Sequence, residues 1–193
     1  MATKTKKKPQ RLARRLSLEL WLEEALEALA EHGPQVLTVE KLCKRLKVSR
    51  GSFYWHFKDR DDFIQKVVNF WDKRLTGSIR DAAKLGQGDA AERLLFLMEL
   101  IDRANAGRYD IPIRAWAAAN ARAAKAVRRT DRTRYEYVRS LFAELGFTGD
   151  ELEMRTRTFV AFHGLERGLS IVENPKDRKR RLKLRHKLLI QTE

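Results

Sequence analysis

The residues that could do chemistry are concentrated in one stretch, Val48 to Phe63, which reads VSRGSFYWHFKDRDDF. It combines serines, a glycine, an arginine and a histidine with several aromatic side chains. Side chains of these types donate hydrogen bonds to phosphate oxygens and to base edges. They do not form a set of nucleophile, base and orienting group of the kind that catalysis needs. The stretch therefore predicts binding and no enzyme activity.

Metal and cofactor chemistry find little support elsewhere in the chain. The only cysteine, Cys43, and four histidines far apart in the sequence provide no familiar zinc or haem spacing. The turn at Gly86 to Gly88 follows no strand and precedes no Gly-Lys-Ser/Thr, so it is not a phosphate loop. We expect no metal, no catalytic residue and no cofactor.

The composition also bears on location. A single cysteine fits a reducing cytoplasm, and we expect a cytoplasmic protein. No apolar run is long enough for a membrane span, and the N-terminus lacks the apolar core of a secretory signal.

The positive charge of the chain is concentrated at its two ends. The 193 residues contain 41 Lys plus Arg and 26 Asp plus Glu, for a net charge of +15. Residues 1–16 carry seven basic groups and no acid, and residues 175–193 carry a net charge of +6. The remaining residues are almost balanced. Net charge alone is therefore weak evidence for a nucleic-acid partner, and the position of particular cations matters more.

The whole chain has the pattern of helices, so we predict an all-α fold of about nine helices. Apolar residues recur at helical spacing in about Ser17 to Glu31, and Thr38, Ser49 and Asp59 are placed to cap the next three helices. Further helices are expected to end near residues 105 and 145, with a shorter one around Trp116 between them. Predicted capping boxes begin at Asp89 and Thr148, the second opening a helix from about 150 to 173.

Four segments follow from these elements. Residues 1–16 form a basic arm, residues 17–62 a helix-turn-helix domain with its motif at about 38–57, residues 63–174 a helical domain, and residues 175–193 a basic C-terminal helix. The helix expected from about Arg50 to Trp55 has only two turns and cannot be stable alone. Its aromatic residues must anchor it, and its short and basic residues then face outward. Gly51 lets its backbone approach another surface closely, as in the major groove of DNA.

At this stretch the sequence resembles the TetR family of transcriptional regulators. The positions that match the family pattern are Gly33, Thr38, Val48, Ser49, Gly51, Phe53, Tyr54, His56, Phe57, Arg60, Asp61 and Asp62. The resemblance covers about residues 17–75. Lys47 stands where the family commonly has glycine, at a cost of about 1 kcal/mol if its φ is positive. Arg60 replaces the usual lysine, which keeps the charge and changes the geometry.

The short helix and its neighbours supply the predicted DNA contacts. A guanidinium can bind guanine with two hydrogen bonds, so Arg50 is assigned to base readout, with a phosphate contact as the alternative. The resemblance implies that Tyr54 and His56 bind phosphate, although His56 could instead be a packing residue. Trp55 contacts a thymine methyl group or sugar, or packs. The full predicted set is Thr38, Lys44, Lys47, Ser49, Arg50, Gly51, Ser52, Tyr54, Trp55, His56, Lys58 and Arg60.

The resemblance also implies a second domain that binds a small ligand and forms a homodimer. The candidate ligand residues are Trp71, Phe96, Arg103, Trp116, Phe142, Phe159, Phe162 and His163, each of which also fits an ordinary core. The helix expected from residue 150 is apolar on two sides, so one side can face a twofold partner. The candidate dimer residues are Phe159, Ala161, Phe162, Gly164, Leu165, Gly168 and Leu169.

The sequence thus indicates a dimeric regulator of transcription, most simply a repressor that a small molecule releases from palindromic operator DNA. An architectural or cell-division-linked DNA-binding protein on the same fold, without a small-molecule effector, is the alternative. The basic C-terminal helix keeps that alternative open, because it could meet a protein partner.

Overall fold

The computed structural model describes residues 16–166, 171 and 173–192, and every regular element in these residues is helical. The all-α prediction is therefore confirmed. The elements are α1 (Leu18–His32), η1 (Pro34–Val36, a 3-10 turn), α2 (Val39–Leu46), α3 (Arg50–His56), α4 (Arg60–Trp71), η2 (Asp72–Gly77, a π-helical segment), α5 (Ser78–Ala83), α6 (Ala90–Ala104), α7 (Gly107–Ala117), α8 (Ala121–Glu144), α9 (Gly149–Leu165) and α10 (Pro175–Ile190).

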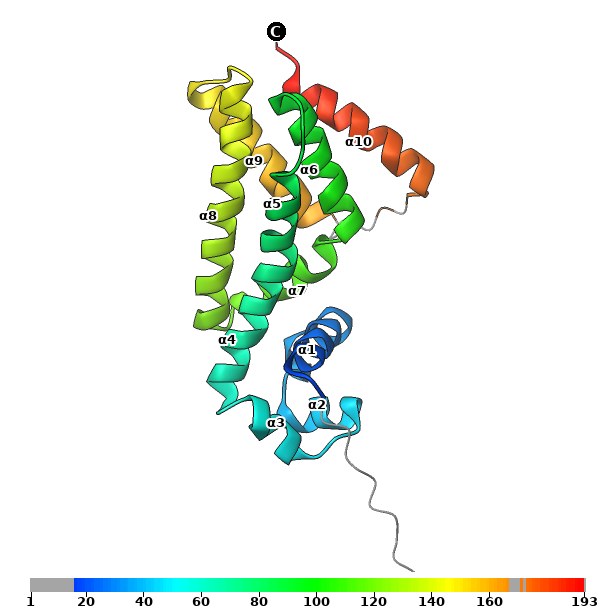
Figure 1. The fold of residues 1–193 in the computed structure, drawn as a ribbon, viewed down its shortest axis with the longest axis vertical. Coiled ribbons are helices and arrows are strands. Elements are labelled where there is room, and N and C mark those ends of the chain that lie inside the picture. Colours follow the sequence, from blue (N-terminus) through cyan, green and yellow to red (C-terminus); the bar gives the residue numbers. More distant parts are fainter. Residues whose placement is uncertain (1–15, 167–170, 172, 193) are drawn as a thin grey trace, which may run out of the picture.

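The three helices α1 to α3 form a head at one end of the molecule (Figure 1). The starts of α1, α2 and α4 follow the predicted caps: the Ser17 hydroxyl accepts from the Leu20 amide, the Thr38 hydroxyl from Lys41, and the Asp59 carboxylate from Asp62. Each of these side chains satisfies an amide that the first helical turn leaves without a backbone partner. The local sequence therefore fixes where these helices begin. The predicted cap of α3 is wrong, because the Ser49 side chain accepts no capping hydrogen bond.

The turn between α2 and α3 depends on Lys47. This residue adopts the left-handed conformation, with φ 55° and ψ 41°. The following amide, on Val48, donates to the carbonyl of Cys43 over 3.0 Å, which is the six-to-one bond that commonly closes a helix. The turn therefore has the geometry that glycine usually provides, and a lysine adopts it at some cost in strain.

The head is not separated from the rest of the molecule. Helix α4 continues without a break through η2 into α5, so one long rod leads from α3 into the body (Figure 1). Val67, Val68 and Trp71 of α4 share one core with the buried faces of α1 and α2. The same core includes Ile113 of α7 and Ala126 of α8. Residues on both sides of residue 62 therefore contribute to one continuous core.

The body helices enclose a second core. It contains Leu94 and Met98 of α6, Phe142 of α8 and Phe159 of α9, and α10 adds Leu182. Helix α10 lies on the outside of α6 (Figure 1). Among the described residues, none of the helices is long and apolar enough to span a bilayer.

Two local predictions on α9 need correction. The sequence predicts a helix to about residue 173, but α9 ends at Leu165, and residues 171 and 173 are not helical. Thr148 does precede the helix, yet its side chain accepts no capping hydrogen bond. The Asp89 and Glu92 capping box, in contrast, is confirmed with both of its hydrogen bonds. A sequence motif places a helix start more reliably than it places the side-chain rotamer.

We predict that Lys47→Gly raises the free energy of unfolding by up to about 1 kcal/mol, because glycine adopts a positive φ without strain. Urea unfolding of the purified chain measures the change. The matched control is Lys44→Gly, in the interior of α2, which should lower stability by about 1 kcal/mol. Equal destabilisation by both substitutions would contradict the strain at Lys47.

Candidate nucleic-acid interface and internal cavity

Helix α3 presents a polar and aromatic face to solvent. Tyr54 is 59% exposed, Trp55 is 68% exposed, and the side chain of Arg50 is 67% exposed. Gly51, next to Arg50, is also exposed, and a Cβ built there would have only the Ser49 hydroxyl near it, at 3.7 Å, among the described residues. The face is therefore accessible, which is what contact with another molecule requires.

The opposite side of α3 is anchored by aromatic packing. Phe53 and Phe57 are each 1% exposed, and the edge of Trp21 approaches both rings, with centroid separations of 5.7 and 6.0 Å. Phe63 of α4 closes the cluster at 5.4 Å from Phe53 and 5.0 Å from Phe57. Edge-to-face pairs of this kind add to the stabilisation from burial. The cluster supplies the order that a two-turn helix lacks by itself.

Arg50 forms an ion pair in the unbound protein. Its Nη2 atom lies 2.9 Å from Oε1 of Glu40 on α2, and both side chains are mostly exposed. An exposed ion pair of this type contributes little free energy, so it orients the guanidinium without preventing its transfer to another acceptor.

His56 connects α3 to the start of α1. Its Nε2 atom lies 2.8 Å from the backbone oxygen of Leu16, and its own carbonyl accepts from Lys66 Nζ over 2.8 Å. The ring therefore already has a partner within the chain on one nitrogen. This favours the packing interpretation of His56 over a direct phosphate contact.

The remaining predicted contact residues surround the exposed face of α3. Ser49, Lys44 and Lys47 are exposed, while Thr38 and Ser52 are half-buried. Ser49 forms no side-chain cap, so its hydroxyl is not committed to the helix. Lys58 and Arg60 are exposed on the turn into α4. The structure thus brings the predicted residues together on one end of the molecule, while the basic arm at 1–15 lies outside the described residues.

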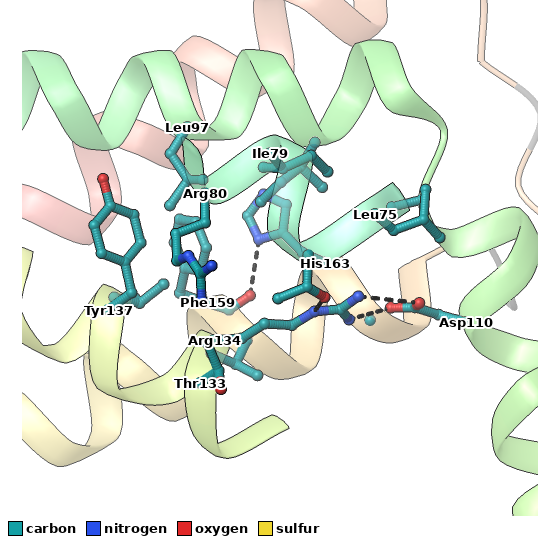
Figure 2. Close-up of a pocket in the computed structure, with 16 residues that line it drawn as sticks. Leu75, Ile79, Arg80, Leu97, Asp110, Thr133, Arg134, Tyr137, Phe159 and His163 are labelled. Carbon is teal, nitrogen blue, oxygen red and sulfur yellow. Dashed lines mark hydrogen bonds and ion pairs between the residues drawn. The ribbon is translucent and has the colours of Figure 1, made fainter. Parts of the chain in front are cut away.

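A cavity of about 60 Å³ lies in the body between η2, α5, α6, α7, α8 and α9. Its walls are mostly apolar and include Leu75, Ile79, Leu97 and Phe159 (Figure 2), together with Val138. It is larger than the roughly 10–15 Å³ that one water needs, and smaller than an engineered cavity of about 150 Å³ that binds benzene. The preformed space therefore suits a small group, and a larger ligand would have to widen it.

One wall of the cavity is a buried ionic network. Asp110 of α7 is 1% exposed and pairs with both terminal nitrogens of Arg134 on α8 (Figure 2). The same carboxylate accepts from the indole nitrogen of Trp71, the last residue of α4, over 3.0 Å. Arg134 Nε also donates to the hydroxyl of Thr76 in η2 over 2.9 Å. A buried carboxylate needs such partners, and here they connect the cavity wall to the rod that carries α3.

His163 of α9 lines the same cavity with both ring nitrogens occupied. Nδ1 lies 2.8 Å from the Phe159 carbonyl, and Nε2 lies 3.4 Å from Nη2 of Arg185 on α10. Desolvation lowers the pKa of His163 to about 3, and the charges of Arg185 and Arg178 act in the same direction. The ring is therefore neutral, with its proton on Nδ1 donated to the carbonyl, and it offers a ligand its face and no free nitrogen.

Half of the predicted ligand residues belong to the two buried cores. Of the eight, Phe159 and His163 line the cavity. Trp71, Trp116 and Phe142 are buried in the two cores. The other three lie elsewhere: Phe96 packs against Gly86, Arg103 is exposed with its Nε bonded to the Glu99 carbonyl, and Phe162 lies under Arg185 at 4.0 Å.

Sequence reasoning missed six polar residues of the cavity, namely Thr76, Arg80, Asp110, Thr133, Arg134 and Tyr137. One signal was available for Arg134. It follows Thr130 by four residues and precedes Val138 by four, so it is a charged residue on the apolar stripe of α8. Asp110 gives no comparable signal, because its burial depends on contacts with α4 and α8.

The predicted dimer residues divide between inside and outside. Phe159 and Gly164 are packed within their own chain, Gly164 against Arg114 of α7. Ala161 and Leu165 are exposed, and Phe162 is half-buried. Gly168 and Leu169 lie outside the described residues. Exposed large apolar side chains gather on α9, on α10 and between them, at Met154, Leu165, Ile171, Leu184 and Leu188, and four of them line an open groove of about 990 Å³.

The arrangement defines a class: an all-helical protein with an N-terminal helix-turn-helix head and a larger helical body. Residues 22–67 match the family model described as "Bacterial regulatory proteins, tetR family". A curated relative, the HTH-type transcriptional regulator AcrR of Shigella flexneri, is 31% identical over 67 residues. That match covers 35% of this chain and 29% of the relative, so the chain spans less than a third of that relative's length.

Solved structures extend the likeness in fold to the whole chain. A putative transcriptional regulator of Pseudomonas aeruginosa PAO1 superposes with a TM-score of 0.72 at 19% identity, over 92% of this chain and 95% of the other. The TetR family regulator PfmR of Thermus thermophilus gives 0.70 at 18% identity, over 88% and 96%. Residues 22–67 of this chain thus match the TetR family model, and the chain shares its fold with solved regulators of that family.

The lowered pKa of His163 predicts an acid-dependent loss of stability. The unfolded chain takes up a proton on this residue below its ordinary pKa of about 6.5, and the folded chain does so only near 3. Above about pH 6.5, His163 therefore costs the folded chain no free energy of unfolding. As the pH falls from 6.5 to 3, the free energy of unfolding decreases because of this residue by up to about 1.4 kcal/mol per pH unit. Urea unfolding at several pH values measures the slope. His163→Gln removes this contribution, and an unchanged slope in that variant would contradict it.

Proposed function

We propose that the chain is a sequence-specific DNA-binding regulator that binds palindromic operator DNA as a homodimer, and most simply a repressor that a small effector releases. The observation that carries the proposal is the exposed face of α3, held by a buried aromatic cluster on its other side. A helix of this size enters the major groove with its N-terminal residues at the base edges. The helix begins with Arg50, which can donate hydrogen bonds to a base, and Gly51, which lets the helix backbone approach the DNA closely.

Within this interface the residues have different tasks. Arg50 provides base readout, because the Glu40 pair leaves its guanidinium oriented and accessible. Tyr54 is exposed on the same helix and fixes register through a phosphate. His56 acts through its contact with Leu16, which positions α3 against the start of α1.

The dimer is proposed to form through α9 and α10. Met154, Leu184 and Leu188 line one groove between these helices, and Leu165 is exposed at the end of α9. A patch of exposed apolar side chains on an otherwise charged chain marks an interaction surface. Twofold packing there would bury the patch and hold two heads for half-sites about one helical turn apart.

Release by an effector is proposed to act through Asp110. This carboxylate holds Trp71 at the end of α4 and Arg134 at the cavity wall. A ligand that changes the position of Arg134 or of Thr76 therefore changes the support of the rod leading to α3. If that ligand prefers one orientation of the heads, operator affinity falls by the same coupling free energy.

We predict that Arg50→Ala weakens binding to the operator by about 1–3 kcal/mol and binding to scrambled duplex by much less, because it removes a base contact. Tyr54→Phe should weaken both alike, because it removes a phosphate contact. Fluorescence anisotropy on an operator selected from random duplexes gives both affinities. Equal losses on the two duplexes for Arg50→Ala would reject its readout role.

We predict that Leu165→Asp combined with Leu188→Asp converts the dimer to a monomer, because each subunit then buries two carboxylates at the interface. Sedimentation velocity gives the mass, and operator affinity should fall with it. Leu85→Asp is the matched control, since Leu85 is 81% exposed and remote from α9 and α10 in sequence. A double variant that stays dimeric would exclude this surface.

A further inference from the structure

We infer that the effector of the cavity is a small monoanionic amphiphile, such as a short-chain carboxylate, whose head is bound by Arg80 and whose apolar part enters the cavity. The inference rests on the proposed function, since it names the ligand class of the same regulator. It is carried by the polar groups that the cavity places around an apolar interior.

Arg80 lines the cavity and remains partly exposed. The residue lies on α5, and its side chain is 40% exposed, yet its Nε atom is buried and has no hydrogen-bond partner in the described part of the chain. The carboxylate that lies nearest to that nitrogen in an ion pair belongs to the adjacent residue, Asp81, at 3.5 Å and mostly exposed. A buried N–H without an acceptor is costly, and an acceptor supplied by a ligand would remove that cost.

The other charged groups of the cavity are already matched. Arg134 and Asp110 neutralise each other at the end of the cavity near Leu75, whereas Arg80 lies nearer Tyr137 (Figure 2). His163 is neutral, with both ring nitrogens engaged. Within the described lining, Arg80 is thus the positive charge that lacks a buried counterpart. Its side chain is partly exposed, so a ligand head bound there can keep part of its hydration.

The interior of the cavity determines the polarity and size of the rest of the ligand. Beyond Arg80 the lining includes Ile79, Leu97, Val138 and Phe159, which favour an apolar chain or ring. The cavity volume of about 60 Å³ limits what fits without movement of the walls. A cationic ligand would be repelled by Arg80, and a neutral one would forgo the charge-assisted hydrogen bond to Arg80.

The test compares ligands that differ only in the head group. Butyrate, hexanoate and octanoate are titrated by calorimetry into the full chain without DNA, beside the amide and amine of each. The carboxylates should bind at least about tenfold more tightly than the matching amides, and the amines should not bind. Arg80→Gln should reduce the preference for carboxylate over amide to near one, and Arg80→Lys should keep part of it.

Arg128→Gln, which changes an exposed arginine on α8, serves as the control and should keep the full preference. Amides that bind as tightly as carboxylates, no carboxylate binding at all, or an unchanged preference in Arg80→Gln would each overturn the inference. Operator binding measured without ligand tests the proposed function separately. If the chain binds its operator but no carboxylate, the proposed ligand class is rejected and the proposed function as a DNA-binding regulator stands.

Discussion

The packing of Phe53 and Phe57 against Trp21 is the constraint on which the binding surface depends. Helix α3 has seven residues, too few to hold its shape in water. Burying two phenylalanines at 1% exposure fixes the helix, and Tyr54 and Trp55 between them then face outward. The same contact therefore stabilises the head and determines which side chains can be read out. The binding surface and the core contact thus lie on opposite sides of the same short helix, α3.

The head is also tied to the body by a small number of specific contacts. Trp71 belongs to the core that α4 shares with α1 and α2, and its indole nitrogen donates to Asp110. Asp110 in turn holds Arg134, which holds Thr76 in the π-helical segment. Buried ionic groups are weak contributors to net stability, and their clearer effect here is to favour one arrangement of the helices. The network is thus suited to favour one position of the α4 rod over another.

Charge is distributed in a way that separates the roles of the two ends. The exposed cations around α3 lie on one end of the molecule, with exposed Arg50 paired to Glu40. On α10 the cations Arg178 and Arg185 are turned inward, where Arg178 pairs with Asp102 and Arg185 lies at 4.0 Å over the ring of Phe162. The high content of arginine and lysine in the last helix therefore includes structural cations, and the helix joins the body through them as well as through its leucines.

Local spacing was enough to predict the helical class, the starts of α1, α2, α4 and α6, and the exposed face of α3. These features follow from residues a few positions apart, such as the Thr38 cap and the succession of Phe53, Tyr54 and Phe57. The turn at Lys47 has the positive φ that the family pattern suggested there. The cavity could not be predicted in this way, because Arg80, Asp110 and Arg134 are far apart in the chain and line one cavity only once the helices are packed. Likewise, Phe142 is as apolar as any pocket residue, and only its packing shows that it fills a core. Caps and apolar stripes are encoded by near neighbours, whereas contacts between distant helices depend on the path of the whole chain.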